Sequence, residues 1–312
     1  MKPNVIVVAG PTASGKTALG IRLAKALDGE IVSADSMQVY RSMPIATAQP
    51  TQEEKQGIRH HLMAFLDPWE PFSVAKYQSL ACDRIGDILS RAKVPILVGG
   101  TGLYIDAVIR NTRFLDCEPT PVRAELEKEL QTDGADALLE RLRNVDPETA
   151  AALHVNDTKR IIRALELYES TGLTMSEQRA QSHCEESPYA FCKLLLCADD
   201  RSVLYRRIDQ RVDQMLSDGL LQEAKAFFEL ENASTVKHAI GYKELKPYFD
   251  GECSLEAAVE RLKMETRRYC KRQLTWFRRY DDFLPLPIDR MTSQQLFETA
   301  LHHCQTFFGV SL

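Results

Sequence analysis

Hydrophobic and polar positions divide the chain into a part where short apolar runs alternate with amphipathic stretches and a part with helical periodicity alone. Within the first hundred residues, the apolar runs typical of buried strands are Asn4–Ala9, Glu30–Ala34 and Val94–Val98. Helical patterns cover Thr17–Leu27 and the stretch from Val74 to about Ala92. Strands that alternate with helices predict right-handed βαβ units, and hence an α/β fold with a parallel sheet and helices on both faces.

The second pattern begins after about Asn111. From Thr120 to Gln181 every periodic segment is helical, with typical helix starts at Asp146-Pro147 and at Asp157 and a typical stop at Gly172. We therefore predict an all-helical insertion over residues 113–188, between two parts of the core that comprise residues 1–112 and 189–312.

The α/β pattern returns after the insertion. The predicted elements are a strand over Phe191–Ala198, long helices over Ser202–Asp218, Leu220–Glu231 and Leu255–Arg279, and a last strand over Phe283–Ile288. Between Val259 and Tyr280, eight Lys and Arg residues stand against two Glu, although the whole chain has a net charge of −5. An acidic protein with one basic helix can bind a polyanion locally.

Composition narrows the class of protein. With 44% hydrophobic and 27% charged residues, the chain resembles an ordinary soluble protein, and its 312 residues can bury a sizeable core without disulfides. The eight cysteines include no C-x-x-C pair, which argues against a zinc ribbon and fits a reducing compartment. The apolar runs are far shorter than the roughly 20 residues that span a bilayer, and no signal peptide fits before Gly10. We therefore expect a cytoplasmic protein that does not bind membranes.

A phosphate-binding motif follows the first predicted strand and opens the first predicted helix. The pattern G-x-x-x-x-G-K-[ST] is matched in full by Gly10, Pro11, Thr12, Ala13, Ser14, Gly15, Lys16 and Thr17. In such a P-loop, backbone N–H groups surround the phosphate oxygens, Lys16 neutralises the outer phosphate and the Thr17 hydroxyl ligates Mg²⁺. The motif predicts a phosphate or diphosphate site, but kinases, ATPases and other transferases share it.

Two further polar residues are predicted at the same edge of the sheet. Asp35 follows the second strand, where parallel sheets place active-site groups. It is either a general base that faces the phosphate site, or a helix N-cap or outer Mg²⁺ ligand. The run Gly99-Gly100-Thr101-Gly102 follows the third strand, and it either brings the Thr101 hydroxyl to the same rim or is simply a tight turn.

These motifs together resemble the tRNA dimethylallyltransferase family, also called tRNA isopentenyltransferases or IPP transferases. The resemblance extends over nearly the whole chain, through Gly10–Thr17, Asp35–Tyr40, His60–Leu62, Gly99–Tyr104, Asn156–Glu166, Ala239–Glu244 and Thr266–Arg278. Several motifs in one order are far more specific than a P-loop alone. Nothing after Trp276 has the Cys/His spacing of the zinc-finger extension of eukaryotic relatives, so the chain resembles the bacterial form, without zinc.

The resemblance implies transfer of a dimethylallyl group from dimethylallyl diphosphate to N6 of adenosine 37, on the 3′ side of the anticodon, in tRNAs that read codons beginning with U. It implies Mg²⁺ as cofactor and the anticodon stem-loop of tRNA as partner, and we expect a monomer. The P-loop then holds the diphosphate of the prenyl donor, and whether ATP also binds there stays open. Asp35 accepts the N6 proton as the C–N bond forms, and the target base must leave its stack to reach the site.

The resemblance also assigns site residues. Catalysis is expected from Asp35, Thr101 and Lys16. Diphosphate binding is expected from the P-loop, and either Arg207 or Arg211 adds a clamp or belongs to a solvated helix face. The expected tRNA-binding positions are Asp35, Ser36, Met37, Gln38, Thr101, Arg123, Lys159, Arg160, Ile161, Ile162 and Arg163. Further phosphate contacts are expected from Lys271, Arg272 and Arg278.

Some interpretations stay open at this point. Tyr269 and Trp276 either stack on RNA bases or pack in the core. Ala46 and Gln49 stand where some relatives carry Gly and Lys, which removes a basic contact from that loop. A small-molecule kinase explains the P-loop equally well but not the basic helix. A prenyltransferase for free adenine nucleotides needs no helical insertion, and a non-catalytic RNA-binding protein needs neither Asp35 nor Thr101 at the rim.

Overall fold

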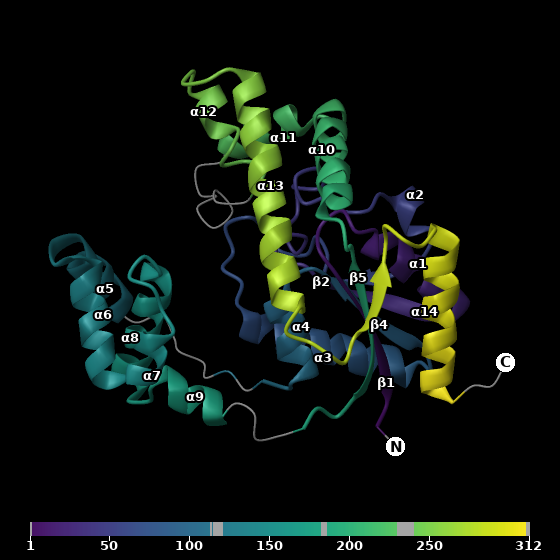
Figure 1. Ribbon diagram of the computed structural model, residues 1–312, viewed down its shortest axis with the longest axis horizontal. Helices are drawn as coiled ribbons and strands as arrows, with labels where there is room; N and C mark the ends of the chain where they lie inside the picture. Colours follow the sequence, from purple (N-terminus) through teal and green to yellow (C-terminus); the bar gives the residue numbers. More distant parts are fainter. Residues whose placement is uncertain (1, 113, 115–120, 182–185, 230–239, 310–312) are drawn as a thin grey trace. The chain divides into compact units, whose positions relative to one another are not determined.

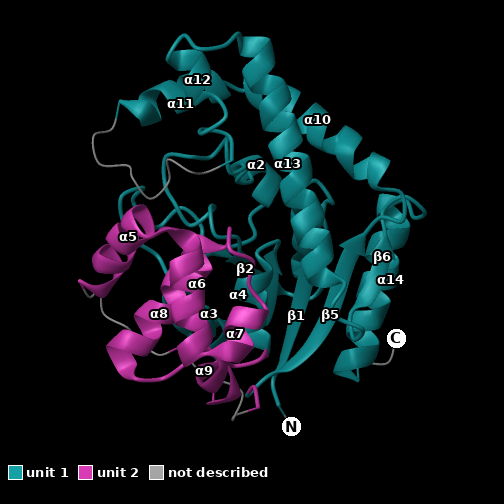
Figure 2. Cartoon of the chain, turned by 60° about the vertical axis from the view of Figure 1, so that its left-hand side comes forward, with its two compact units in different colours: residues 1–109, 188–312 teal, residues 110–187 magenta. Residues whose placement is uncertain are grey.

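The computed structural model describes residues 2–112, 114, 121–181, 186–229 and 240–309 (Figure 1). The chain forms two compact units, one of Met1–Ile109 with Pro188–Leu312 and one of Arg110–Ser187 (Figure 2). The predicted insertion, residues 113–188, differs from the second unit by three residues at its start and one at its end. Residue 113 itself, Ala239 and the predicted helix end at Glu231 lie outside the described residues.

Unit 1 is built on a parallel sheet with the strand order β3-β2-β4-β1-β5-β6. The strands are β1 (Asn4–Ala9), β2 (Gly29–Ala34), β3 (His60–His61), β4 (Val94–Gly99), β5 (Ala190–Cys197) and β6 (Leu284–Pro287). The predicted α/β fold and its five strands are confirmed to within two residues at each end. Sequence analysis missed β3 because two residues are too few to show a period.

Helices cover both faces of this sheet. On one face, α1 (Lys16–Ala26) and α14 (Ser293–Phe308) pack against apolar side chains of the sheet, and on the other α3 (Val74–Ser90) and α4 (Gly102–Ile109) do so. Ser73 caps α3 as its sequence pattern indicates, since its hydroxyl accepts the N–H of Lys76. Each face of the sheet therefore has its own hydrophobic cluster. The carboxyl ends of the strands lie outside both clusters and can carry polar groups.

A third hydrophobic cluster of unit 1 lies beyond the carboxyl ends of the strands. It is formed by α10 (Arg201–Ser217), α11 (Leu220–Phe228), α12 (Lys246–Phe249), α13 (Leu255–Phe277) and the segment from Met37 to Ala46. A short helix, α2 (Gln52–Lys55), follows that segment. Figure 1 shows α13 running beside α10 and past the strand ends. This arrangement brings residues far apart in sequence close to the P-loop.

Unit 2 is all-helical, with α5 (Val122–Thr132), α6 (Gly134–Val145), α7 (Pro147–Ala151), α8 (Thr158–Thr171) and α9 (Met175–Gln181). Two predicted helix ends are confirmed: Asp146 caps α7 by accepting the N–H of Thr149 at 3.0 Å, and Gly172 ends α8 with φ of 74°. The helix start predicted at Asp157 is also confirmed, because Asp157 occupies the N-cap position of α8, but its side chain makes no cap bond. Its carboxylate accepts the N–H of His154 at 3.2 Å and bonds no amide of α8.

In the part of the chain that the structure describes, no helix combines the length and the apolar character that a membrane span requires. The described cysteines are all free thiols.

Candidate active site at the strand ends

The carboxyl ends of β1, β4 and β2, which are neighbours in the sheet, carry the P-loop, the turn before α4, and Asp35. A cavity of about 80 Å³ opens between them. Its lining comprises Thr12, Lys16, Thr17, Ile31, Ser33, Asp35, Gln38, Thr47, His60, Met63, Val98, Gly99, Arg211, Tyr269 and Gln273. The fold thus brings the predicted phosphate-binding and proton-accepting groups to one place.

The P-loop backbone has the conformation that its glycines predict. Gly10 has φ of 154°, and a Cβ there would lie 2.7 Å from the carbonyl oxygen of Leu196, so only glycine fits. Gly15 has φ of 93° and precedes α1 without any side-chain cap. The first N–H groups of α1 therefore have no side-chain acceptor at the helix start, which is the arrangement that binds anions.

Lys16 is half-buried at the start of α1, and its Nζ donates to the Pro11 carbonyl oxygen at 2.7 Å. The pKa of Lys16 is lowered to about 8, chiefly by burial, while the charge of Asp35 opposes this change and the charge of Arg211 adds to it. Two cations thus share a poorly solvated cavity with one carboxylate. A phosphate or diphosphate there would offset the excess positive charge.

Asp35 is held by the backbone that follows it. Its Oδ1 accepts the N–H groups of Met37 at 2.9 Å and Gln38 at 3.3 Å. Among the hydrogen bonds of the described residues, none engages Oδ2. One oxygen therefore fixes the carboxylate while the other stays available to a ligand, as a general base requires.

Thr101 lies beside Asp35 through contacts between the two strand ends. Its N–H donates to the Ala34 carbonyl oxygen at 3.1 Å, and its Oγ1 accepts the N–H of Ser36 at 3.0 Å. The same Oγ1 donates to Ser36 Oγ at 3.3 Å. The run Gly99–Gly102 therefore does more than turn the chain, because it fastens β4 to β2 at the rim.

Two residues of α13 complete the site, and sequence analysis did not assign them to it. Gln273, which is 6% exposed, accepts the N–H of Thr12 at 2.8 Å and donates to the Gly100 carbonyl oxygen at 2.9 Å. Burial and the charge of Asp35 raise the pKa of Tyr269, against hydrogen bonds with Thr101 and Gln273. Tyr269 is therefore a cavity residue and not an exposed stacking platform. The four-residue spacing between the two, which puts them on one helix face, was the available signal.

The structure separates the two arginines of α10. Arg211 reaches the cavity, where its Nη1 lies 3.4 Å from Thr12 Oγ1 and burial lowers its pKa. Arg207 is exposed and does not line the cavity, but it lines an outer cleft of about 520 Å³ that Lys16, Thr17 and Arg211 also border. Arg211 is thus positioned to contact an anion inside the cavity, whereas Arg207 lies at the cleft.

A second cavity of about 350 Å³ begins at Asp35 and extends between α10, α11 and α13. Its lining is mainly apolar, with Met37, Ala46, Ile208, Val212, Met215, Leu220, Ile240 and Leu262. In the loop before it, Gln49 Nε2 donates to the carbonyl oxygen of Tyr40 at 2.9 Å. Glu223 holds the same loop by accepting the N–H groups of Ile45 and Ala46, each at 2.8 Å.

The expected RNA-contacting residues of unit 2 fall into three groups. Ile161 and Ile162 are 0% and 4% exposed, so their side chains pack in the hydrophobic core of unit 2. Arg123 and Arg163 both bind the buried carboxylate of Glu166, at 3.1 and 2.9 Å.

Lys159 and Arg160 form the third group. Both side chains are exposed, and the ion pairs of the described residues include neither of them. In the predicted RNA-binding stretch, Lys159 and Arg160 are therefore the cations without a carboxylate partner. Ile161 and Ile162 hold the same helix, α8, in the hydrophobic core of unit 2.

Much of the basic charge of α13 is neutralised by carboxylates. Lys263 pairs with Asp213 at 2.7 Å and Arg267 with Asp209 at 2.8 Å, both on α10. Arg268 pairs with Glu265 at 2.6 Å. The side chains of Lys271, Arg272 and Arg278 are exposed. Lys271 and Arg272 on α13, with Arg278 directly after it, therefore remain the best placed of the predicted phosphate contacts.

Trp276 packs within unit 1. A Cβ at Gly102 would lie 2.1 Å from its ring, and the guanidinium of Arg279 stacks over the ring at 3.9 Å. This contact favours the core-packing interpretation of Trp276 over base stacking.

Among the described residues, no group of three or more His, Cys, Asp or Glu side chains could hold a metal ion. Mg²⁺ needs no such group, because it retains waters and binds mainly through substrate phosphates and one or two protein oxygens. The oxygens of Thr17 and Asp35, which both line the cavity, are groups of the kind that this requires.

Sequence comparisons give consistent results. The sequence model of the family described as IPP transferase matches residues 38–280, and one described as isopentenyl transferase matches residues 3–65. A tRNA dimethylallyltransferase of Geobacillus thermodenitrificans is 49% identical over 282 residues, covering 89% of this chain and 88% of that protein. One of Bacillus subtilis is 47% identical over 280 residues, covering 89% and 88%.

Solved structures are similar over nearly the whole chain. A full-length tRNA isopentenylpyrophosphate transferase from Bacillus halodurans matches with a TM-score of 0.72 and 41% identity, over 99% of this chain and 98% of that one. A eukaryotic dimethylallyltransferase acting on tRNA matches with a TM-score of 0.84 and 31% identity, over 98% of this chain and 80% of that one.

Proposed function

The chain belongs to the IPP transferase family and is an enzyme that transfers a prenyl group to tRNA, and we propose that its donor is dimethylallyl diphosphate and its acceptor N6 of adenosine 37. The acceptor tRNAs are those that read codons beginning with U. The observation that carries the proposal is that Asp35 and the P-loop line one cavity, with Thr101 accepting the N–H of Ser36 directly after Asp35.

The residues at the rim suit this reaction. The adenine N6 amine is a weak nucleophile because its lone pair is delocalised into the ring. As the bond from N6 to C1 of the dimethylallyl group forms, the C1–O bond breaks and the N6 proton passes to Asp35. Thr101 holds the Ser36 N–H beside the carboxylate, which positions the segment expected to contact the target nucleotide.

The leaving diphosphate is stabilised by the other side of the same cavity. Lys16, Arg211 and the first N–H groups of α1 supply positive charge where negative charge develops on the leaving oxygen. When bound at Thr17, Mg²⁺ adds further charge neutralisation to the diphosphate.

Recognition of tRNA rests on exposed cations. We assign the contacts with the anticodon stem-loop backbone to five exposed side chains: Lys159 and Arg160 on α8, Lys271 and Arg272 on α13, and Arg278 directly after α13. The target adenosine leaves its stack to reach Asp35, as in other enzymes that act on a base.

The experiment that tests the proposal uses the pure protein with unmodified tRNA, Mg²⁺ and dimethylallyl diphosphate. The RNA is then digested and its nucleosides are weighed. We expect one adenosine that is heavier by a single prenyl unit, and a nuclease fragment that maps it to the 3′ side of the anticodon. A transcript with guanosine at position 37 is the matched control and gives no product.

Two outcomes would contradict the proposal. Prenylation of free adenine nucleotides but not of tRNA would reassign the acceptor. Hydrolysis of ATP or phosphoryl transfer without any modified adenosine would return the P-loop to a kinase function.

A further inference from the structure

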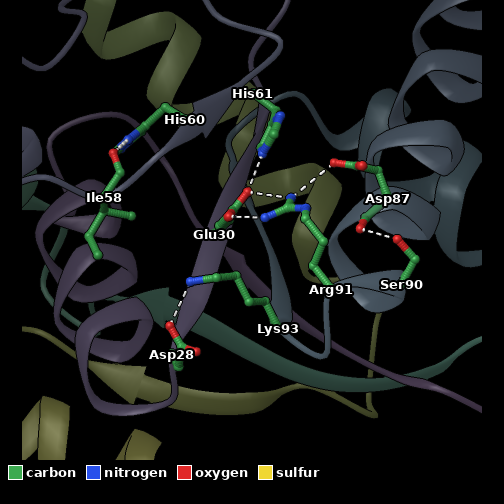
Figure 3. A network of polar contacts seen from close by, with 9 residues as sticks. All are labelled: Asp28, Glu30, Ile58, His60, His61, Asp87, Ser90, Arg91 and Lys93. Atoms are coloured by element: carbon green, nitrogen blue, oxygen red, sulfur yellow. Dashed lines mark hydrogen bonds and ion pairs between the residues drawn. The ribbon is translucent and has the colours of Figure 1, made fainter.

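An imidazole in the active-site cavity has no role in the reaction described so far. β3 runs beside β2 with His60 opposite Ile31 and His61 opposite Val32. Because successive strand residues point to opposite faces, the two histidines have different surroundings (Figure 3). His61 Nε2 lies 2.7 Å from Glu30 Oε2 in a buried ion-pair network, whereas His60 lines the cavity.

The hydrogen bond at one ring nitrogen fixes the state of the other. His60 Nδ1 lies 2.9 Å from the Ile58 carbonyl oxygen, which can only accept, so Nδ1 carries the hydrogen. Nε2 is then an acceptor, and it is buried without a hydrogen-bond partner among the described residues. Burial lowers the pKa of His60, and nearby Lys55 and His61 lower it further against the Ile58 hydrogen bond. The imidazole is therefore neutral at physiological pH.

A buried acceptor without a partner is costly, by about 1–3 kcal/mol, so its persistence points to a ligand. The other hydroxyls of this part of the cavity are engaged. Ser33 Oγ donates to Gln38 Oε1 at 3.2 Å, and Thr47 Oγ1 donates to the Met43 carbonyl oxygen at 2.6 Å. These hydroxyl oxygens can still accept, but among the described residues that line the cavity His60 Nε2 is the buried polar side-chain atom without any hydrogen bond.

The position of His60 along the sheet identifies the part of the ligand that it meets. Its neighbour Ile31 precedes Asp35 by four residues on β2, which corresponds to roughly 13 Å of strand. Ile31, Met63 and Val98 line the cavity with it. The lining near His60 is therefore largely apolar, with the Ser33 hydroxyl opposite Val98 on the neighbouring strand and His60 Nε2 as the unsatisfied acceptor. An apolar wall suits a hydrocarbon chain, and the acceptor suits a hydroxyl on that chain.

We propose that this part of the cavity receives the tail of the donor's C5 chain and that His60 Nε2 accepts a hydrogen bond from a hydroxyl on its terminal carbon. The enzyme accordingly also uses the hydroxylated C5 allylic diphosphate, 4-hydroxy-3-methylbut-2-enyl diphosphate. This inference rests on the proposed function. The C1–O bond breaks, the N6–C1 bond forms, the N6 proton passes to Asp35, and the terminal hydroxyl is unchanged. With the unhydroxylated donor, a water occupies the hydroxyl's place.

The test compares the two donors with one tRNA. The wild-type enzyme, Mg²⁺ and unmodified tRNA are incubated with each diphosphate, and kcat/KM is measured from the modified nucleosides. The product of the hydroxylated donor is heavier by one oxygen atom. The readout is kcat/KM for the hydroxylated donor divided by kcat/KM for dimethylallyl diphosphate. This ratio is insensitive to the fraction of folded enzyme. We expect both donors to be used.

Two variants of His60 isolate the acceptor. His60→Asn keeps an N–H for the Ile58 carbonyl oxygen but has no group at the position of Nε2. The ratio of kcat/KM for the hydroxylated donor to kcat/KM for dimethylallyl diphosphate should therefore fall about tenfold. His60→Gln extends an amide oxygen toward that position and should recover part of the ratio. Met63→Leu, a change in the same lining without a polar atom, is the control and should leave the ratio within about twofold.

The outcomes separate the two proposals. If neither donor is transferred, the proposed function fails. If dimethylallyl diphosphate is used and the hydroxylated donor is not, this inference alone is overturned. An unchanged ratio in His60→Asn overturns it as well, because the hydroxyl then binds elsewhere.

Discussion

The strand-end cavity of unit 1 and the helix α8 of unit 2 hold their charged groups by different means. In the cavity, Asp35 is fixed by the N–H groups of two following residues, with no cation bonded to it among the described side chains. On α8, the buried carboxylate of Glu166 binds Arg163 and also Arg123 of α5. Backbone donors orient a charge and leave it reactive, whereas an ion pair orients two charges and offsets both.

This difference separates residues that can react from residues that can only bind. A carboxylate with a free oxygen in a poorly solvated cavity can accept a proton. A guanidinium already paired to a carboxylate attracts phosphate less than a free one does, so RNA affinity depends on the few cations without partners. The following predictions test this contrast, from the largest expected effect to the smallest.

The first prediction tests whether Asp35, the carboxylate of the cavity, acts as the base. Asp35→Asn keeps an oxygen for the N–H groups of Met37 and Gln38 but cannot take a proton, so kcat should fall about 10²–10⁴-fold. Because no cation contact is lost, the Kd for tRNA should change less than about twofold. Single-turnover prenylation and filter binding measure the two quantities. Unchanged turnover would remove Asp35 as the base.

The second prediction tests the ion pairs that Glu166 makes with Arg123 and Arg163. Burial alone would raise the pKa of Glu166, but hydrogen bonds from Arg123 and Arg163 outweigh burial and lower it. Because the folded-state pKa lies below the unfolded one, this contribution to stability is present above the unfolded pKa, about 4.3, and is lost as pH falls through the folded value.

Glu166→Gln should therefore destabilise unit 2 by about 1–3 kcal/mol, since the carboxylate is buried but its partners are half-exposed. Urea denaturation at neutral pH, followed by a probe in unit 2, measures the change. The difference between variant and wild type should narrow in acid. A difference that is independent of pH would mean that the ion pairs are not its source.

Lys16 differs from the paired arginines in two ways: it takes part in no ion pair among the described residues, and it loses its charge within an accessible pH range. Its pKa of about 8 means that the cation is lost as pH rises above that value. The Kd for inorganic diphosphate should then increase up to about tenfold per pH unit above 8, relative to Lys16→Arg, which stays charged. Calorimetry of both proteins between pH 7 and 10 cancels the ionisation of the ligand. Parallel profiles would place Lys16 away from the bound anion.

The smallest effect is expected from the exposed cations of α8. Lys159→Ala with Arg160→Ala should leave kcat unchanged and reduce the slope of log K for tRNA against log salt by roughly 1.5, from two lost phosphate contacts. Arg143→Ala is the matched control, because Arg143 is already paired with Glu140. Equal effects of the two changes would show that ion pairing does not distinguish RNA-binding cations.

Much of this site could be predicted because its parts obey local rules. The P-loop is a contiguous motif, and Asp35 and Thr101 each follow a strand whose apolar run is visible in the sequence. Parallel strands place their carboxyl ends at one edge, so adjacency in the sheet brings these residues together. The burial of Ile161 and Ile162 did not follow from the motif that contains them, because a motif does not state which side of its helix is buried.

The sequence alone therefore determined the α/β class, the helical character of the insertion, the P-loop and the family resemblance, since each depends on periodicity or on neighbouring residues. Tertiary structure decided the rest. Gln273 bonds the N–H of Thr12 across 261 residues, and Arg211 rather than Arg207 enters the cavity. Such contacts depend on how helices pack around the strand ends, where a shift of one position along a helix rotates a side chain by about 100°.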